Sequence, residues 1–349
     1  MKTGAGQSSV MKKLFLCLAF ALVLTNCSLQ TPDLEQYVFR GATMGTSYNI
    51  KIVVPKNDST NTTKLHADIK FLLNYVNSVA STYVDDSELS RFNHYAANRW
   101  MAASPDLVGL VDVSMQISRL SGGAFDITVG PLVNLWGFGP EHNPVDVPSE
   151  KEIARRKKLV GYEYLQVRYD PPSLRKNIDS LYCDLSAIAK GWGVDKVAEL
   201  LERQSFENYL VEIGGEIRAK GMNVKGSAWR IGVSSPRGAG GIDKVINVTN
   251  IGVATSGDYR NYFEKDGVRY SHTIDPRSGA PIQHELASVT VIHPSCMMAD
   301  AFATAIDVLG PEDGLKLARE NNLALFMILK SKEGFEEKMT PSFEQYIAQ

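Results

Sequence analysis

The chain has 349 residues, of which 44% are hydrophobic and 22% are charged, and it carries a formal net charge of −2. A chain of this size and composition has enough apolar side chains for one large or two ordinary domain cores, so we expect a folded globular body. Because its Lys and Arg residues form no sustained block, the sequence shows no sign of a nucleic-acid partner.

The N-terminal residues have the pattern of an export signal. Met11-Lys-Lys begins a positive segment that leads into an apolar core of about eleven residues, too short to span a bilayer as a stable helix. The core ends in Leu24-Thr-Asn-Cys27, which resembles the bacterial lipoprotein signal, in which cleavage before the cysteine is followed by attachment of lipid to it. We therefore predict a signal peptide over residues 1–27, a polar tether over 28–36 and a folded body over 37–349.

Lipid on Cys27 would anchor the protein at the periplasmic side of a bacterial membrane. Asn26 departs from the small residue that usually precedes the cysteine, so ordinary cleavage to a soluble periplasmic protein is the alternative. The folded part then contains Cys183 and Cys296. Neither lies in a CxxC or zinc spacing, so two buried free thiols are favoured over a disulfide.

The first part of the body indicates strands, helices and a polar loop. In chain order these are two strands about the turn Gly41-Ala-Thr-Met-Gly45, an amphipathic helix that Thr63 could cap, a polar loop over Asp85 to Asn93, and a helix from Ser104-Pro105 to Gly122-Gly123. Gly122 and Gly123 are typical of a helix C-cap, but they also let backbone amides approach a ligand. The apolar run that follows contains Trp136 and Phe138, which could form a wall against a flat aromatic group.

The middle of the chain contains a lysine in an unusual place. A capping box at Ser149-Glu-Lys-Glu152 opens a basic surface helix that ends near Gly161, and Pro171-Pro172 makes a turn between two strands. Further on, a strand leads into a helix that Asp184 or Ser186 could cap. Lys190 then lies in the first turns of that helix, where the dipole disfavours a cation and favours a phosphate. Both a bound anion beside Lys190 and a solvent-exposed lysine are compatible with this position.

The second half of the chain is rich in strands. Glu212 and Glu216 lie beside a predicted hairpin turn at Gly214-Gly215. Further strands are expected at 229–234, 245–248, 252–256, 270–274 and 286–292, followed by helices over 295–309 and 311–321 and a closing strand over 323–329. Helices that alternate with hairpin-like strand pairs predict an α+β fold, a strand-rich mixed α/β body with largely antiparallel sheets. No change in composition marks a boundary, so the number of subdomains stays open.

The helix that follows Ser295 brings oxygen groups to a buried setting. Asp300 and Thr304 are four residues apart, so both side chains project from one face, and Asp307 follows one turn later. Their neighbours are small or apolar, and a buried unpaired charge is costly, so Asp300 requires a partner. Mg²⁺ is one such partner because it prefers oxygen ligands. The alternative is an Asp favoured by the helix dipole and a Thr bonded back to its own helix.

Common phosphate-binding and catalytic motifs are absent from the sequence. It has no G-x-G-x-x-G, G-x-x-x-x-G-K-[ST], G-x-S-x-G or HExxH, and its six histidines follow no zinc pattern. Two loops rich in Gly, Ser and Asp precede the acidic helix, one at Thr255-Ser-Gly-Asp258 and one at His272-Thr-Ile-Asp-Pro-Arg-Ser-Gly279. A histidine at a strand end is usually structural, and His272 is a candidate because function tends to lie on such loops.

Several segments together carry a family resemblance. They are Met44-Gly-Thr, Ser81-Thr-Tyr-Val-Asp-Asp-Ser-Glu-Leu-Ser-Arg-Phe-Asn93, Gly122-Gly-Ala-Phe-Asp-Ile-Thr-Val-Gly-Pro-Leu-Val-Asn-Leu-Trp-Gly137, Asp184-Leu-Ser-Ala-Ile-Ala-Lys-Gly191, Glu212-Ile-Gly-Gly-Glu216, Ala254-Thr-Ser-Gly-Asp-Tyr259, His272-Thr-Ile-Asp-Pro-Arg-Ser-Gly279 and Ala299-Asp-Ala-Phe-Ala-Thr304. In this combination and order, from about Tyr37 to Leu329, the sequence resembles the ApbE-type flavin transferases (FAD:protein FMN transferases). The resemblance implies an ApbE-like body related to the tunnelling-fold class.

The same resemblance implies a Mg²⁺-dependent enzyme. Such an enzyme would move the FMN half of FAD, by a phosphoester bond, onto a Thr or Ser hydroxyl of another exported or membrane protein and would release AMP. Position by position, the resemblance implies that Asp300, Thr304 and the carbonyl of Ala187 hold the metal and that His272 and Asp300 take part in catalysis. It implies an FAD site lined by Met44, Tyr83, Ala124, Phe125, Asp126, Asp184, Lys190 and Ile274.

The chemistry of these residues agrees with that assignment. A metal at Asp300 and Thr304 would neutralise the diphosphate, and Lys190 would add positive charge. His272 or a nearby carboxylate could accept the proton of the incoming hydroxyl, and the sequence does not decide between them. Two alternatives remain: hydrolysis of FAD to FMN and AMP, which needs the same ligands, and a non-catalytic FAD-binding lipoprotein.

Overall fold

The computed structural model describes residues 33–139, 146–236, 241–257 and 262–348. The predicted signal peptide and Cys27 lie outside these residues. Among the helices of the described part, none combines the length and the apolar character that crossing a membrane requires. Cys183 and Cys296 are both buried free thiols, which confirms the preference for thiols over a disulfide.

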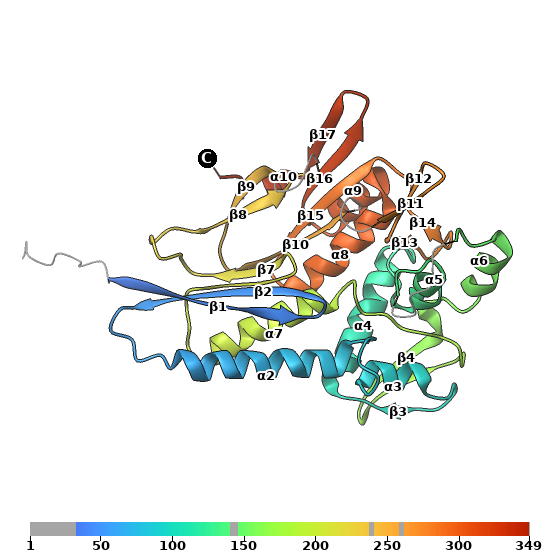
Figure 1. Cartoon of the computed structure of the whole chain (residues 1–349), viewed down its shortest axis with the longest axis horizontal. Coiled ribbons are helices and arrows are strands. Elements are labelled where there is room, and N and C mark those ends of the chain that lie inside the picture. The colour runs from blue at the N-terminus through green and yellow to red at the C-terminus, as the bar shows by residue number, and fades with distance from the viewer. Residues whose placement is uncertain (1–32, 140–145, 237–240, 258–261, 349) are drawn as a thin grey trace, which may run out of the picture.

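An antiparallel sheet of eight strands forms the centre of the fold (Figure 1). Every neighbouring pair in it is antiparallel, which confirms the largely antiparallel α+β fold. In spatial order its strands are β1 (Leu34–Thr43), β2 (Thr46–Pro55), β6 (Tyr209–Ile213), β7 (Glu216–Lys220), β10 (Ile251–Gly257), β15 (Leu286–His293), β16 (Ala324–Ser331) and β17 (Gly334–Met339).

Different layers cover the two faces of this sheet. Alternate side chains of β6 point to opposite sides, so Val211 joins the helix-side core whereas Leu210 packs with Trp229 on the other side. The helix side holds α2 (Thr62–Ala80), α7 (Ala189–Arg203), α8 (Cys296–Leu309) and α9 (Pro311–Glu320). The other side holds the hairpin of β8 (Trp229–Ser234) and β9 (Ile242–Val248) together with α10 (Pro341–Glu344).

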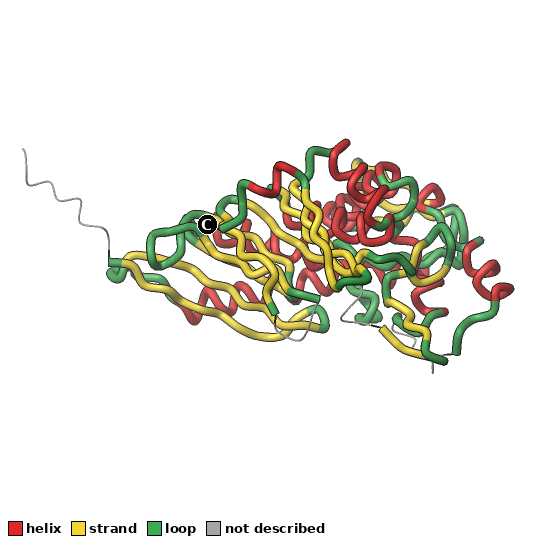
Figure 2. Tube along the Cα trace, turned by 90° about the horizontal axis from the view of Figure 1, so that it is seen from above, coloured by secondary structure: helices red, strands yellow, loops and turns green. Residues whose placement is uncertain are grey.

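A mostly helical region adjoins the sheet and lies at the right of the view in Figure 2. Its core is continuous with that of the sheet, because Phe92 and Leu107 share one buried cluster with Phe302 of α8. It contains α3 (Glu88–His94), α4 (Pro105–Leu120), η1 (Ile127–Val129), α5 (Gly130–Leu135), α6 (Glu150–Lys157) and η2 (Tyr162–Tyr164). This region contains a small sheet, in the order β3 (Met101–Ala102), β5 (Pro172–Lys176) and β4 (Leu165–Tyr169). Two short hairpins complete the fold. One pairs β11 (Tyr262–Lys265) with β12 (Val268–Ser271), and the other pairs β13 (Ile274–Asp275) with β14 (Ala280–Pro281).

Some predicted elements are wrong. The expected polar loop at 85–93 contains α3, which Ser87 caps by accepting a hydrogen bond from the amide of Ser90. The strand expected at 270–274 is interrupted after Ser271. The expected closing strand is not the last element, because β17 pairs with β16 along the edge of the sheet.

Several boundaries also differ from those predicted. β1 begins at Leu34, inside the predicted tether, because it pairs with β2 as far as Pro55. Asn61, not Thr63, caps α2. α7 begins at Ala189 without a side-chain cap, since the carboxylate of Asp184 instead accepts hydrogen bonds from the amide and the hydroxyl of Ser186.

Candidate active site

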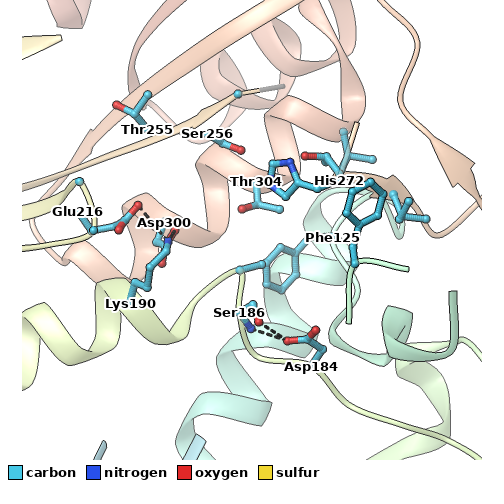
Figure 3. A pocket seen from close by; sticks show the side chains of 18 of the residues that line it. Phe125, Asp184, Ser186, Lys190, Glu216, Thr255, Ser256, His272, Asp300 and Thr304 are labelled. Atoms are coloured by element: carbon cyan, nitrogen blue, oxygen red, sulfur yellow. Dashed lines mark hydrogen bonds and ion pairs between the residues drawn. The ribbon is translucent and has the colours of Figure 1, made fainter. Parts of the chain in front are cut away.

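A cavity of about 630 Å³ opens beside α7, α8 and the strands β7 and β10 (Figure 3). Eleven of the twelve site residues predicted from the sequence line it: Tyr83, Ala124, Phe125, Asp126, Asp184, Ala187, Lys190, His272, Ile274, Asp300 and Thr304. They come from five separate stretches of the chain, so the fold gathers into one space residues that are up to 221 positions apart, from Tyr83 to Thr304.

Three charged side chains meet at one end of the cavity, and we call them the charged cluster: Lys190, Glu216 and Asp300 (Figure 3). They come from the start of α7, the start of β7 and the middle of α8. The Lys190 ammonium lies 3.0 Å from Glu216 Oε1 and 3.6 Å from Asp300 Oδ1. The amide of Gly191 donates a hydrogen bond of 2.9 Å to Asp300 Oδ2. Lys190 therefore lies in an ionic site, so the solvent-exposed alternative is wrong.

A glycine allows α7 and α8 to come close enough to form this cluster. A Cβ atom on Gly191 would collide with the carbonyl oxygen of Cys296 and would lie 2.8 Å from Asp300 Cβ. Five residues after Lys190, the Asp195 carboxylate accepts hydrogen bonds from the first backbone amides of α8. These contacts fix how the two helices face one another.

Burial and charge determine the ionisation of the cluster. Burial raises the pKa of Asp300 and raises that of Glu216 to about 7, although Lys190 partly offsets both shifts. For Lys190, burial alone would lower the pKa, but the two carboxylates raise it by more, so its pKa lies above the ordinary value. Once both carboxylates are ionised, the cluster carries one more negative than positive charge, and a further cation would stabilise it.

The oxygen atoms at this end fit a hard divalent cation. Asp300 Oδ1 contacts the Lys190 ammonium only at 3.6 Å, beyond hydrogen-bond distance, and Thr304 and Ala187 line the same cavity. The part of the chain that the structure describes holds no group of three or more His, Cys, Asp or Glu side chains suited to a metal ion. Mg²⁺ needs no such cage, because one or two carboxylates together with phosphate oxygens commonly hold it.

Asp307 has a supporting position. It is fully buried and does not line the cavity. Its Oδ2 atom accepts hydrogen bonds from Ser256 Oγ at 3.0 Å and from Thr273 Oγ1 at 3.3 Å, and both of these residues line the cavity. Asp307 therefore holds the wall of the cavity from behind.

Away from the charged cluster, the cavity is lined by loop residues that include aromatic and apolar side chains as well as polar ones. Phe125 is buried, and Phe138 and Ile274 line the same cavity. The Tyr83 side chain is 64% exposed, which places its ring at the mouth. Burial, followed by the nearby charge of Asp184, raises the pKa of this tyrosine. These surfaces suit a flat ring system.

The two carboxylates at this end organise the loops themselves. Asp126 Oδ1 accepts hydrogen bonds from the amide and the hydroxyl of Thr128, and its Oδ2 accepts one from the amide of Tyr162. Burial raises the pKa of Asp126 to about 6, against the lowering effect of these hydrogen bonds. Asp184 likewise accepts two hydrogen bonds from Ser186. Both carboxylates therefore shape the wall that a ligand would meet.

His272 and Met44 have different outcomes. His272 lines the cavity, and its ring lies edge-on to Phe138 with 6.3 Å between ring centroids. Met44 is not among the lining residues. It occupies the β1–β2 turn with φ at 51°, and its sulfur lies 3.4 Å from the position of a Cβ added to Gly193, so it packs onto α7. The structure thus does not bring Met44 into the cavity with the other predicted residues.

The sequence interpretation left several lining residues out of the site. They include Ser186, Glu212, Gly214, Gly215, Glu216, Thr255, Ser256 and Thr273. The most consequential is Glu216, which is 3% exposed and forms an ion pair with Lys190. A charged residue directly after a Gly-Gly turn was the available signal, but the sequence does not show which helix that turn would meet.

Comparison with known proteins agrees with this geometry. The model of the ApbE family matches residues 44–327, a range that contains every lining residue named above. The chain is 45% identical over 339 residues to the FAD:protein FMN transferase of Vibrio cholerae, covering 97% of this chain and 100% of that protein. It is 42% identical over 343 residues to the FAD:protein FMN transferase of Haemophilus influenzae, covering 96% and 98%.

Solved structures agree as well. The flavin transferase ApbE from Vibrio cholerae superposes with a TM-score of 0.84 at 45% identity, covering 90% of this chain and 99% of that one. The apo form of the Pseudomonas stutzeri flavinyl transferase ApbE gives a TM-score of 0.83 at 41% identity, covering 90% and 98%. With a matching family model, similar sequences and the same architecture, this chain belongs to the ApbE family.

Proposed function

We propose that this protein is a transferase that moves the FMN half of FAD onto a Ser or Thr hydroxyl of a target protein and releases AMP. One observation supports the proposal: the same cavity is lined by the charged cluster and by the aromatic rings of Phe125 and Tyr83. FAD has a diphosphate and flat rings, and these match the two ends. Full-length relatives named FAD:protein FMN transferases support the same activity.

The reaction is a phosphoryl transfer with a simple balance of bonds. The acceptor oxygen forms a bond to the phosphorus of the FMN half, and the bond from that phosphorus to the bridging oxygen breaks. AMP leaves with the bridging oxygen, and the hydroxyl proton passes to a base. His272 and the carboxylates that line the cavity are the candidate bases. A well-placed base contributes roughly 10²- to 10⁴-fold to the rate.

The remaining requirement is to neutralise the diphosphate. Lys190 supplies a cation that stays protonated between its two carboxylates. Asp300, Thr304 and the carbonyl of Ala187 are the groups that would hold Mg²⁺, which supplies charge neutralisation at the phosphates and at the leaving AMP. Since these residues lie on or beside α7 and α8, the fold positions them before substrate binds.

Flavin attachment to an acceptor tests this proposal directly. The chain without residues 1–27 is incubated with FAD, MgCl₂ and an acceptor domain that exposes a Ser/Thr-Gly-Ala-Thr-type loop. We expect the acceptor to fluoresce on a denaturing gel, AMP to appear in equal amount, and EDTA to abolish both. An acceptor with Ala in place of the Ser/Thr is the control. Free FMN and AMP with an unlabelled acceptor would identify a hydrolase, and intact FAD would identify a binding protein.

We also propose that the protein is exported and carries lipid on Cys27, at the periplasmic side of a bacterial membrane. The positive start, the short apolar core and Leu24-Thr-Asn-Cys27 support this. Cells that express the full chain are labelled with a fatty-acid analogue and fractionated, with Cys27→Ser as the control. Label in the membrane fraction of the unaltered chain alone is the expected result. An unlabelled, soluble periplasmic protein would show ordinary cleavage instead.

A further inference from the structure

The charged cluster is asymmetric. The Lys190 ammonium lies at hydrogen-bond distance from Glu216, at 3.0 Å, but at 3.6 Å from Asp300. A lysine and a divalent cation are competitors for the same carboxylate oxygen. The position of the ammonium between Glu216 and Asp300 therefore influences how readily Asp300 can bind a metal.

The β6–β7 hairpin fixes Glu216 and the stem of Lys190 in this arrangement. Gly214 in its turn has φ at +64°, and a Cβ added there would lie 3.3 Å from Lys190 Cδ and 3.4 Å from Glu216 Oε2. The turn thus packs directly against both partners of the shorter ion pair. On the opposite side, the amide of Gly191 holds Asp300 Oδ2 in place.

Glu216 is buried although its hydrogen bonding is incomplete. It is 3% exposed, and among the described residues its Oε2 atom has no hydrogen-bond partner. Burying a carboxylate with one oxygen unsatisfied is costly, so a purely structural role is poorly served by this residue. Within the described part of the chain, its Oε1 atom forms an ion pair with the Lys190 ammonium.

We propose that Glu216 is a positioning residue for the metal site: it draws the Lys190 ammonium away from Asp300 and so leaves Asp300 Oδ1 open to a divalent cation. This rests on the proposed function, since it assumes that Asp300 is a metal ligand. It goes further by giving Glu216 a role that acts through Lys190. Without Glu216, the ammonium would move toward Asp300 and compete with the metal.

A direct effect of Glu216 is the competing explanation. Its negative charge could attract the cation by itself, or it could bind the metal. A double-mutant cycle separates the two cases, because an effect that passes through Lys190 disappears when Lys190 is neutral, whereas a direct effect persists.

The experiment measures Mn²⁺ binding by electron paramagnetic resonance, without FAD, on the chain lacking residues 1–27. Glu216→Gln is expected to raise the Kd for Mn²⁺ by roughly 10- to 100-fold, as loss of a residue that orients a metal ligand typically does. In the Lys190→Met background, the same substitution is expected to change the Kd by no more than about twofold. Circular dichroism and thermal unfolding check the fold, and Lys190→Gln replaces Lys190→Met should the latter fail to fold.

The outcomes separate this inference from the proposed function. An equal rise in Kd in both backgrounds overturns the positioning role and leaves the metal site intact. No effect of Glu216→Gln in either background also overturns it. If the wild type binds no Mn²⁺, or if Asp300→Asn binds it as tightly as the wild type, the metal assignment of the proposed function fails as well.

Discussion

The two ends of the cavity are built in different ways. The charged cluster rests on regular elements, with each side chain held by an ion pair or a helix amide. The aromatic end rests on loops, where Asp126 and Asp184 use their hydrogen bonds to hold neighbouring backbone. Charged groups must meet reacting phosphates at fixed distances, whereas flat rings mainly need apolar surface. The contrast predicts that substitutions at the charged cluster lower turnover, whereas substitutions at the aromatic end lower the affinity for FAD or the stability of the fold.

The largest expected effect is on turnover at the charged end. Asp300→Asn keeps the size of the side chain and removes its charge, so we expect flavin transfer to fall by about 10³-fold or more. FAD binding, followed by flavin fluorescence, should survive in this variant. Asp307→Asn in the same helix is the matched control. Because Asp307 supports the cavity wall from behind, the Asp307→Asn variant should have a lower thermal stability and keep most of its turnover. Unchanged turnover in Asp300→Asn would reject its role as metal ligand.

At the loop end, the largest loss of stability is expected on substitution of Lys176, the last residue of β5. The buried Lys176 ammonium donates hydrogen bonds to the carbonyls of Asn93, Asp179 and Leu181, and so ties down the segment that leads to the cavity wall. Lys176→Met leaves these carbonyls unsatisfied, and we expect a loss on the order of 3 kcal/mol in the free energy of unfolding. Urea denaturation measures it, with the exposed Lys151→Met as the control. A loss no larger than that of the control would contradict the anchoring role.

Asp126 should give the loop end a pH-dependent stability. Burial raises its folded-state pKa to about 6, above the ordinary value that applies in the unfolded chain. The folded protein therefore keeps a proton that the unfolded chain loses, and this contribution to stability is present near pH 4 and is lost as pH rises through 6. Relative to Asp126→Asn, the wild type should lose on the order of 2–3 kcal/mol between pH 4 and pH 7. Urea titrations at several pH values test this, and parallel profiles would contradict it.

The smallest expected effect is at the mouth of the cavity. The Tyr83 ring is 64% exposed, so Tyr83→Ala should leave thermal stability unchanged. Loss of a ring that stacks on a base costs about 1–3 kcal/mol, so the KM for FAD should rise by roughly tenfold or more while kcat changes little. Tyr83→Phe keeps the ring and should behave like the wild type. A fall in kcat without a change in KM would place Tyr83 with the chemistry instead.

The helix α8 could be predicted from the sequence because the signals that specify this helix are local. Ser295 caps α8 as expected, and the spacing of Asp300 and Thr304 places both at the cavity. Glu216 was not assigned to the site because its role depends on the approach of a hairpin turn to α7, which no local pattern encodes. Met44 lies in a turn that packs onto α7, which the sequence could not distinguish from a position in the cavity.

The missed elements have equally physical reasons. β17 has a mostly exposed, charge-rich pattern, so neither alternation nor apolar content marks it as a strand. It forms because β16 offers an edge to pair with. α3 is only seven residues long and lies in a polar stretch, so its one local signal was the capping Ser87. In both cases the neighbouring structure, rather than the segment's own pattern, decides the conformation.

Asp195 ties together the same three elements that carry the charged cluster. From α7 it accepts a hydrogen bond of 2.9 Å from Arg218 of β7 and one of 2.7 Å from the Ser295 hydroxyl at the start of α8. Asp195 thus joins α7, β7 and α8 at a second point, away from the cavity. A shift of any one of these elements would break its hydrogen bonds to Arg218 or Ser295, so the three elements are already in place when a dinucleotide binds. The conformational entropy lost on ordering α7, β7 and α8 is therefore lost during folding, and little rearrangement of these elements is needed when the dinucleotide binds.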